Sequence, residues 1–422
     1  MTNKLGWYDE ERREYVVTLA NDDWTPRPWS NIITNKEFGT LVTCSGASFT
    51  WFLNSALFRL TPWVNDPVVE SSGELIYLSD ETTSEVWSPL PLPIREKSAY
   101  EIRHGLGYTT FLHTSHQLVQ KVKIFVHPQK PIKYVEITLT NLAKVPRKIS
   151  LSYYCQWVLG DFAQNTNRQL WVGCKSPEKT AVLAKVLGND FRSEYTAYLT
   201  SDGDLHLATD RGVFFGHKPS NDPCGVVKRI LNILPGQEVS VTFSLGVIKE
   251  VKDISKNYSK KAFIDGQEFW QKITKTVSVD CPDQDLNNLF NDRLVYQTLS
   301  SRLWGRVGMY QPGGAYGFRD QLQDSLALVW TEPALTRDQI LKAARQQQFS
   351  GEVSQWWHPP ENFGVLSSSS DTHLWLVYCA CKYWQITGDD TIFAEKIPYL
   401  NDQSNREGTL YEHCLISIER TL

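Results

Sequence analysis

Apolar and polar residues alternate along much of the first 262 residues, the pattern of β-strands with one buried face. The alternation is clearest in Leu118–Val126, Tyr134–Thr140, Lys148–Tyr154 and Glu238–Ser244. Turn-forming residues separate the segments, among them His127-Pro128, Asn141, Lys144-Val145-Pro146, Asp202-Gly203 and Pro235-Gly236. No long helical pattern lies between them, so we predict a large antiparallel β-sandwich over residues 1–262.

From about residue 262 the apolar spacing changes to that of a helix. Residues 263–272 and 286–303 carry helical spacing, and Asp283 and Asp285 lie where they can cap the second helix. We therefore predict a helical linker over residues 263–305. Beyond it, helices are predicted at 317–331, 336–348, 371–387, 390–400 and 409–422.

The helix predicted at 371–387 is apolar over most of its circumference, so we expect it to be buried on several sides. Ser370 or Asp371 is expected to cap its start, and Gly388 to end it. The last predicted helix reaches Leu422 without a glycine or proline stop, and we therefore expect a chain that has been cut short. The predicted domains are 1–262, 263–305 and 306–422.

Composition narrows the class of protein. Charged residues make up 21% of the chain and the net charge is −4, so no basic field favours nucleic acid. The N-terminus has no apolar run of the signal-peptide type, and no stretch approaches about eighteen consecutive apolar residues. The eight cysteines are scattered without metal-ligand spacing, so we predict reduced thiols in a cytoplasmic protein and no metal site.

The segment 310–324 concentrates glycines and polar side chains before a predicted helix. Gly313, Gly314 and Gly317 allow a ligand to approach the backbone, and Arg319 and Asp320 lie in the first helical turn. Asp320 and Asp324 are one turn apart and repel each other, so they need a partner, either Arg319 or sugar hydroxyls. The alternative is that acidic residues simply favour a helix N-terminus and the glycines make turns.

A second motif, Trp356-Trp357-His358 followed by two prolines, lies about thirty residues further on. The prolines exclude a helix, so we predict a loop. Either tryptophan can stack on a sugar ring, and His358 can donate to a hydroxyl or a phosphate. The alternative is a tryptophan that fills a core, in a chain with 15 tryptophans. The serine-rich segment 364–371 is either a phosphate-binding loop or a linker and cap.

Both motifs resemble those of the glycoside phosphorylases once called glycosyltransferase family 36, which include the cellobiose and chitobiose phosphorylases. Within that group the likeness is greatest to the phosphorylase-like C-terminal region of cyclic β-1,2-glucan synthases. The first half of the chain agrees at Phe38-Gly39, Ser45-Gly46, Thr50-Trp51, Asn54-Ser55, 60–63, 65–67, 85–89 and 104–108. The likeness covers nearly the whole chain.

The resemblance implies an N-terminal β-supersandwich, a helical linker, an (α/α)6 barrel, of which this chain holds the first part, and a C-terminal jelly roll. It also implies inverting phosphorolysis of β-linked glucans, in which an Asp acid protonates the glycosidic oxygen and phosphate attacks the anomeric carbon. Inorganic phosphate is then a co-substrate, and no cofactor is needed. The candidate substrate-binding residues are Tyr310, Arg319, Asp320, Gln323, Asp324, Trp356, Trp357, His358 and Asp371.

The chain departs from the family pattern at three places. We find no motif resembling Asp-Trp-Asn-Asp-Gly, which carries the general acid in the family, and expect that Asp beyond Leu422. In the segment 364–372 two family arginines and an aspartate are replaced, so that Leu366 and Thr372 stand where the family holds the transferred sugar. Ala56-Leu57-Phe58 replaces polar residues near the family's dimer contact.

Three hypotheses follow from these departures. The chain is a fragment of a phosphorylase-type enzyme that is inactive alone, a non-catalytic carbohydrate-binding remnant, or a structural module of a larger glucan synthase. The expected partners are a β-glucan oligosaccharide, phosphate, and either a second copy in a homodimer or a missing C-terminal segment.

Overall fold

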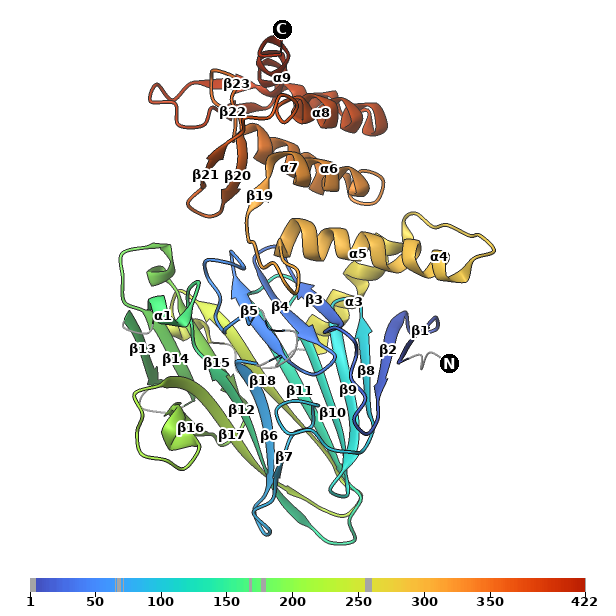
Figure 1. Cartoon of the computed structure of the whole chain (residues 1–422), viewed down its shortest axis with the longest axis vertical. Helices are drawn as coiled ribbons and strands as arrows, with labels where there is room; N and C mark the ends of the chain where they lie inside the picture. Colours follow the sequence, from blue (N-terminus) through green and yellow to red (C-terminus); the bar gives the residue numbers. More distant parts are fainter. Residues whose placement is uncertain are drawn as a thin grey trace. The chain divides into compact units, whose positions relative to one another are not determined.

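The computed structural model describes residues 5–64, 66, 70, 72–166, 169–175, 180–254 and 260–421. The chain divides into two compact units (Figure 1). The first unit comprises residues 1–268 together with 308–312, and the second comprises 269–307 together with 313–422.

The first unit is built from antiparallel strands in three sheets within the described residues (Figure 1). The largest sheet has the order β1 (Gly6–Asp9), β2 (Glu14–Leu19), β8 (Tyr100–Gly105), β9 (Tyr108–Ser115), β10 (Leu118–Val126), β11 (Ile132–Asn141), β18 (Glu238–Ile248), β15 (Thr196–Ser201), β14 (Ala181–Val186) and β13 (Leu170–Cys174). The second has the order β16 (His206–Asp210), β17 (Pro223–Ile233), β12 (Arg147–Gln156), β6 (Glu74–Asp80) and β7 (Val86–Trp87). The third joins β3 (Ser30–Thr34), β4 (Phe38–Thr43) and β5 (Ser48–Phe52).

Alternation along the strands forms the core of this unit. In β10 the buried residues include Leu118, Val122 and Ile124, spaced by multiples of two, while Lys121 between them is exposed. Val122 pairs with Phe111 of β9 and with Ile137 of β11, so one buried row crosses three strands. The same core includes apolar residues of the other two sheets. The predicted antiparallel sandwich is therefore confirmed.

The four strands predicted from alternation correspond to β10, β11, β12 and β18, each reproduced within a few residues. The helices observed among the described strands are short: α1 (Ala163–Thr166) and α2 (Arg211–Phe214). Phe58, one of the three residues that replace polar family residues, is buried and packs against Phe52 and Phe191. This substitution therefore adds to the core.

A buried ion pair joins the three sheets. Lys133 of β11 donates to Glu74 of β6 at 2.6 Å, and both side chains are about 1% exposed. Glu74 also accepts hydrogen bonds from Thr50 of β5 at 2.6 Å, from Thr61 at 2.7 Å and from Tyr153 of β12. Each carboxylate oxygen therefore has two donors, as a buried charge requires.

The second unit is mainly helical. It contains the end of α3 (Lys260–Lys275), α4 (Gln284–Asn288), α5 (Val295–Gln297), α6 (Phe318–Ser325), α7 (Pro333–Ala344), α8 (Leu374–Thr387) and α9 (Leu410–Glu419). Two π-helical segments, Leu289–Leu294 and Thr298–Gly305, make 284–305 one continuous helical stretch. The side chain of Asp283 accepts from the amide of Leu286 at 3.1 Å, which confirms the predicted cap. The order of sheets followed by helices agrees with the predicted fold class. The domain bounds proposed from the sequence stay a prediction.

α6 turns an apolar face to the core of the second unit. Phe318, Leu322 and Val329 are buried, and Leu326 packs against them from the following 3-10 turn, Leu326–Leu328. α6, α7, α8 and α9 pack on one another around this cluster. The helix predicted at 317–331 therefore contributes its apolar face to this core.

Three local predictions were wrong. Residues 390–400 form a 3-10 turn, Asp390–Ala394, and the strand β22 (Lys396–Pro398), which pairs with β23 (Glu407–Thr409). α8 begins at Leu374 with no side-chain cap from Ser370 or Asp371, although Gly388 ends it as expected. α8 is also less enclosed than predicted, because Tyr378 and Trp384 are about half exposed. An apolar helix surface thus does not by itself show that every face is covered.

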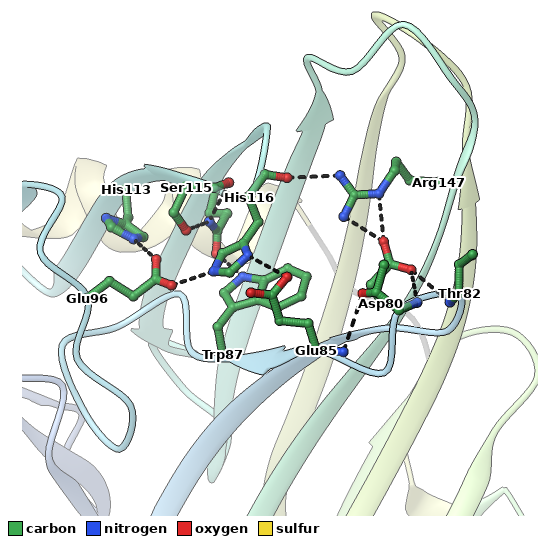
Figure 2. Close-up of polar contacts among 11 residues, drawn as sticks. Asp80, Thr82, Glu85, Trp87, Glu96, His113, Ser115, His116 and Arg147 are labelled. Carbon is green, nitrogen blue, oxygen red and sulfur yellow. Dashed lines mark hydrogen bonds and ion pairs between the residues drawn. The ribbon is translucent and has the colours of Figure 1, made fainter.

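A polar network supports the turn between β9 and β10 in the first unit (Figure 2). His116 adopts the left-handed conformation at φ 49° in this turn. Its imidazole stacks on Trp87 with ring centroids 4.2 Å apart and lies between the carboxylates of Glu85 and Glu96. Arg147 donates to the carbonyl oxygen of His116 at 2.9 Å. The contacts hold a conformation that non-glycine residues seldom adopt.

Glu96 is the centre of this network. It contacts His116 on one side and His113 at 3.0 Å on the other. Burial raises the pKa of Glu96, but hydrogen bonds from Ser115, His113 and His116 outweigh burial and hold the pKa below its usual range. The ionised carboxylate is therefore the form that the fold stabilises.

We predict that Glu74→Gln lowers the free energy of unfolding by about 3–5 kcal/mol, because Lys133 is then left charged and buried without its counter-ion. Urea unfolding followed by circular dichroism measures the loss. Glu194→Gln is the control: Glu194 pairs with Lys249 at an exposed site, where the expected change is below about 1 kcal/mol. Equal effects of the two substitutions would contradict a special role for the buried pair.

We predict that Glu96 makes the first unit more stable above the unfolded-state pKa of a glutamate, about 4.3. Since the folded-state pKa is depressed, this contribution is lost as the pH falls through the folded-state value. Urea unfolding at a series of acidic pH values should show a shallower loss of stability in Glu96→Gln than in the wild type. Glu85→Gln, at the more exposed carboxylate, is the control. Parallel pH profiles for wild type and Glu96→Gln would argue against the assignment.

Candidate functional site

The two motifs singled out from the sequence meet in a small three-stranded sheet of the second unit. β19 (Tyr316–Gly317) pairs with β20 (Ser354–His358), which pairs with β21 (Phe363–Leu366). Tyr316 lies opposite Trp357, and His358 lies opposite Phe363. Trp356-Trp357-His358, predicted as a loop, and the start of the segment 364–371 are therefore strands. Proline after His358 excludes a helix but does not exclude a strand that ends there.

The strand places the two adjacent tryptophans on opposite faces. Trp357 is 1% exposed and stacks on Tyr316 with ring centroids 5.4 Å apart, so its ring belongs to the core of the unit. Trp356 is 37% exposed. The proposed sugar-stacking role therefore fits Trp356, whereas the core-filling alternative fits Trp357. Gly364 lies against this strand so closely that a Cβ would collide with the carbonyl oxygen of Trp356.

The outer face of the hairpin carries an aromatic row. His358 contacts Trp356 edge to face, with centroids 5.5 Å apart, and stacks on Phe363 at 5.0 Å. Phe363 and Val365 of β21 are about half exposed. Burial lowers the pKa of His358, and the positive charge of Arg306 lowers it further, so the imidazole is neutral at neutral pH. A neutral imidazole presents one donor and one acceptor, which suits hydroxyl ligands.

The candidate residues of α6 and its surroundings form two separate ion pairs. Arg319 contacts Asp371 at 3.4 Å, and both side chains are about half exposed. Asp324 pairs with Arg302 at 2.8 Å. Burial raises the pKa of Asp324, the charge of Arg302 opposes this, and Asp320 raises it further. The expected partner of the two aspartates was either Arg319 or sugar hydroxyls, and the structure pairs Asp324 with Arg302 rather than with Arg319.

The remaining candidate residues are exposed. Asp320 and Gln323 lie on the solvent side of α6. Tyr310 is also exposed and belongs to the first unit. The structure thus brings together Trp356, His358 and Phe363 on one face and pairs Arg319 with Asp371.

The serine-rich segment after β21 is held by side-chain hydrogen bonds. Ser367 donates its one hydroxyl proton to Oε1 of Gln355 at 2.6 Å and accepts from the amide of Ser369, and the hydroxyls of Ser367 and Thr372 lie 3.0 Å apart. Thr372 is buried, whereas Leu366 is 41% exposed. Where the family resemblance leads one to expect an arginine and an aspartate, this surface carries an apolar side chain and a buried hydroxyl.

Sequence reasoning missed the buried groups beneath the hairpin. Arg306 ends the helical stretch in the left-handed conformation at φ 48° and donates to the carbonyl oxygens of Leu303, Trp304 and Gly314. It also donates to the hydroxyl of Tyr316, as does Lys342 of α7. A single arginine after an apolar helix was the available signal, and it does not reveal these partners.

Within the part of the chain that the structure describes, no three His, Cys, Asp or Glu side chains are arranged to hold a metal ion. All eight cysteines are free thiols. None of the helices among the described residues is both long and apolar enough to span a membrane.

Two family models match the chain. The supersandwich domain of glycosyl hydrolase 94 matches residues 13–261, and the catalytic domain of the glycosyl hydrolase 94 superfamily matches residues 269–422. The two matched ranges together cover most of the chain.

Individual relatives agree with the family models. The chain is 34% identical over 99% of its length to the cyclic β-(1,2)-glucan synthase NdvB of Rhizobium meliloti (strain 1021). It is 25% identical over 99% of its length to an N,N'-diacetylchitobiose phosphorylase of Vibrio furnissii. A solved structure described as a kojibiose phosphorylase from the human microbiome superposes over 93% of this chain, with a TM-score of 0.59 and 12% identity. At that identity the likeness shows the fold alone.

The chain is shorter than each of these proteins. It spans 16% of the glucan synthase, 59% of the chitobiose phosphorylase and 58% of the solved chain.

We predict that Trp357→Ala destabilises the second unit by about 3–5 kcal/mol, because it removes a buried ring from the core. Trp356→Ala should change the stability by less than about 1 kcal/mol, because its ring is partly in water. Thermal unfolding of both variants measures the difference. Similar destabilisation by the two substitutions would contradict the division of roles between them.

Proposed function

The chain belongs to the glycosyl hydrolase 94 family, and we propose from this that its second unit binds β-linked gluco-oligosaccharides. The observation that carries the proposal is the aromatic row on the outer face of the hairpin. Aromatic rings pack on the C–H faces of sugars, and the imidazole of His358 lies in the same row. The Arg319–Asp371 pair supplies further donors and acceptors at the surface.

We propose inverting phosphorolysis as the reaction class in which this unit takes part. In that reaction an acid delivers a proton to the glycosidic oxygen while the bond to the anomeric carbon breaks. A phosphate oxygen forms the new bond from the opposite face, and the product is a glycosyl 1-phosphate of inverted configuration. Phosphate replaces the base-activated water of an inverting hydrolase, so one carboxylic acid is sufficient. Relatives described as phosphorylases support this choice.

The candidate residues of this chain suit binding better than proton transfer. Asp371 accepts from Arg319, and Asp324 accepts from Arg302, so both carboxylates serve as acceptors in ion pairs. The role we propose for them is to orient the arginines toward sugar hydroxyls, since a paired guanidinium is held in one direction.

The free thiols support a reducing compartment, and we propose the cytoplasm.

A second candidate function is carbohydrate binding without catalysis, as a module of a larger glucan synthase. The exposed Leu366 and the buried Thr372 favour it, because they stand where the resemblance places a charged clamp on the transferred sugar. Loss of a charged hydrogen bond weakens binding by roughly 1.5–3 kcal/mol. In this second function the aromatic row binds glucan, and the chain does not catalyse its cleavage.

The binding proposal predicts that β-1,2- or β-1,4-gluco-oligosaccharides change the tryptophan fluorescence of the chain and that Trp356→Ala weakens the affinity about tenfold, near 1.4 kcal/mol. Trp330→Ala is the control, since Trp330 is 63% exposed and lies outside the hairpin. Incubation with phosphate and the same sugars distinguishes the two functions, because phosphorolysis releases glucose 1-phosphate and binding without catalysis does not. Release of glucose 1-phosphate would support the enzyme, and an unchanged affinity in Trp356→Ala would exclude the hairpin as the binding face.

A further inference from the structure

The strongest unassigned feature of the second unit is the environment of the Tyr316 hydroxyl. The guanidinium of Arg306 donates to it at 3.0 Å, and the ammonium group of Lys342 donates to it at 3.0 Å. Both cations also lie over the face of the same ring, at 4.3 and 4.5 Å from its centroid. Tyr316 is 8% exposed, so little water reaches this oxygen.

The hydroxyl oxygen of Tyr316 has two hydrogen-bond donors beside it. A guanidinium and an ammonium group are donors only. Among the described residues, the hydroxyl of Tyr316 contacts these two groups and has no acceptor for a proton of its own. A neutral phenol here would direct its O–H toward cations, where it finds no acceptor. A phenolate accepts both hydrogen bonds and has no proton of its own to donate.

The charges around Tyr316 support the same conclusion. Arg306 follows the second π-helical segment, Lys342 lies on α7, and His358 on β20 is close enough to Arg306 to have its pKa lowered. Burial alone raises the pKa of Tyr316, but the charges of Arg306 and Lys342 outweigh burial and bring the pKa below the usual value. Buried cations are stable when an anion neutralises them.

We propose that Tyr316 is ionised in the folded protein and that its phenolate is the counter-ion of Arg306 and Lys342. It acts as a positioning residue for the sugar-binding face. Its ring supports Trp357, which is adjacent to Trp356 on β20, and its backbone pairs with that strand. The phenolate thereby joins the end of the helical stretch, α7 and the hairpin through one oxygen.

Ionisation can be measured directly, without any sugar. Tyrosine labelled with carbon-13 at Cζ gives 18 signals for the 18 tyrosines, and ionisation moves a Cζ signal downfield. At neutral pH we expect one signal at the phenolate position. Tyr316→Phe should remove that signal, and acidification should return it reversibly to the neutral position in the wild type.

Tyr383→Phe is the matched control. Tyr383 is also buried in the second unit, but its hydroxyl donates to Asp389 at 2.8 Å, and burial raises its pKa. This substitution should leave the phenolate signal in place. Lys342→Met should shift the ionisation of Tyr316 to higher pH, and it keeps the proposal testable if Tyr316→Phe does not fold.

Neutral signals for all 18 tyrosines at neutral pH would overturn the proposal. So would a phenolate signal that persists in Tyr316→Phe or a Lys342→Met profile identical to the wild type. The first result would mean that Lys342 is neutral and accepts the phenolic proton.

The positioning role rests on the proposed sugar binding and has its own readout. We expect Tyr316→Phe to weaken oligosaccharide affinity about tenfold and to remove the change in affinity with pH that accompanies protonation of Tyr316. A phenolate signal without any sugar binding would refute the proposed function while leaving the ionisation established. Sugar binding of equal affinity and equal pH dependence in wild type and Tyr316→Phe would refute the positioning role alone.

Discussion

The first unit depends on one buried charge pair, Glu74 with Lys133, because it lies where three sheets meet. Apolar packing favours burial but tolerates many arrangements of the sheets. A carboxylate with four donors tolerates very few, since the removal of any one leaves a buried charge partly unsatisfied. Thr50, Tyr153 and Lys133 come from different sheets, so their convergence on Glu74 fixes how these sheets pack.

The second unit meets the same constraint with a different anion. Arg306 is buried and donates to three backbone carbonyl oxygens. These carbonyls satisfy its hydrogen bonds but carry no full negative charge. Lys342 adds a second positive charge at the same point. The oxygen of Tyr316 is the group both cations share, and the strand that carries Trp356 is built on that tyrosine. The same tyrosine therefore neutralises the buried cations and positions the strand on the outer surface.

Patterns with a short period predicted much of this fold, because β-strand alternation and helical spacing depend on neighbours in sequence. β10, β18 and α6 follow directly from such patterns. Contacts between distant residues do not have a period. Arg302 was not predicted as the partner of Asp324, nor Lys342 as that of Tyr316, because nothing in the spacing brings them together. The strand β20 was missed for a related reason: its pairing with β21 is visible only after the chain has turned at the prolines.

The two adjacent tryptophans of the motif have different physical roles: Trp356 is partly exposed and Trp357 is buried. Neighbours on a strand point to opposite faces, so Trp356 and Trp357 cannot both contact one ligand while β20 remains paired. The proposed sugar site needs an exposed ring held in a fixed orientation. Burial of Trp357 against Tyr316 supplies that rigidity. For the proposed sugar site we therefore expect the buried Trp357 to be as necessary as the exposed Trp356, although Trp357 belongs to the core.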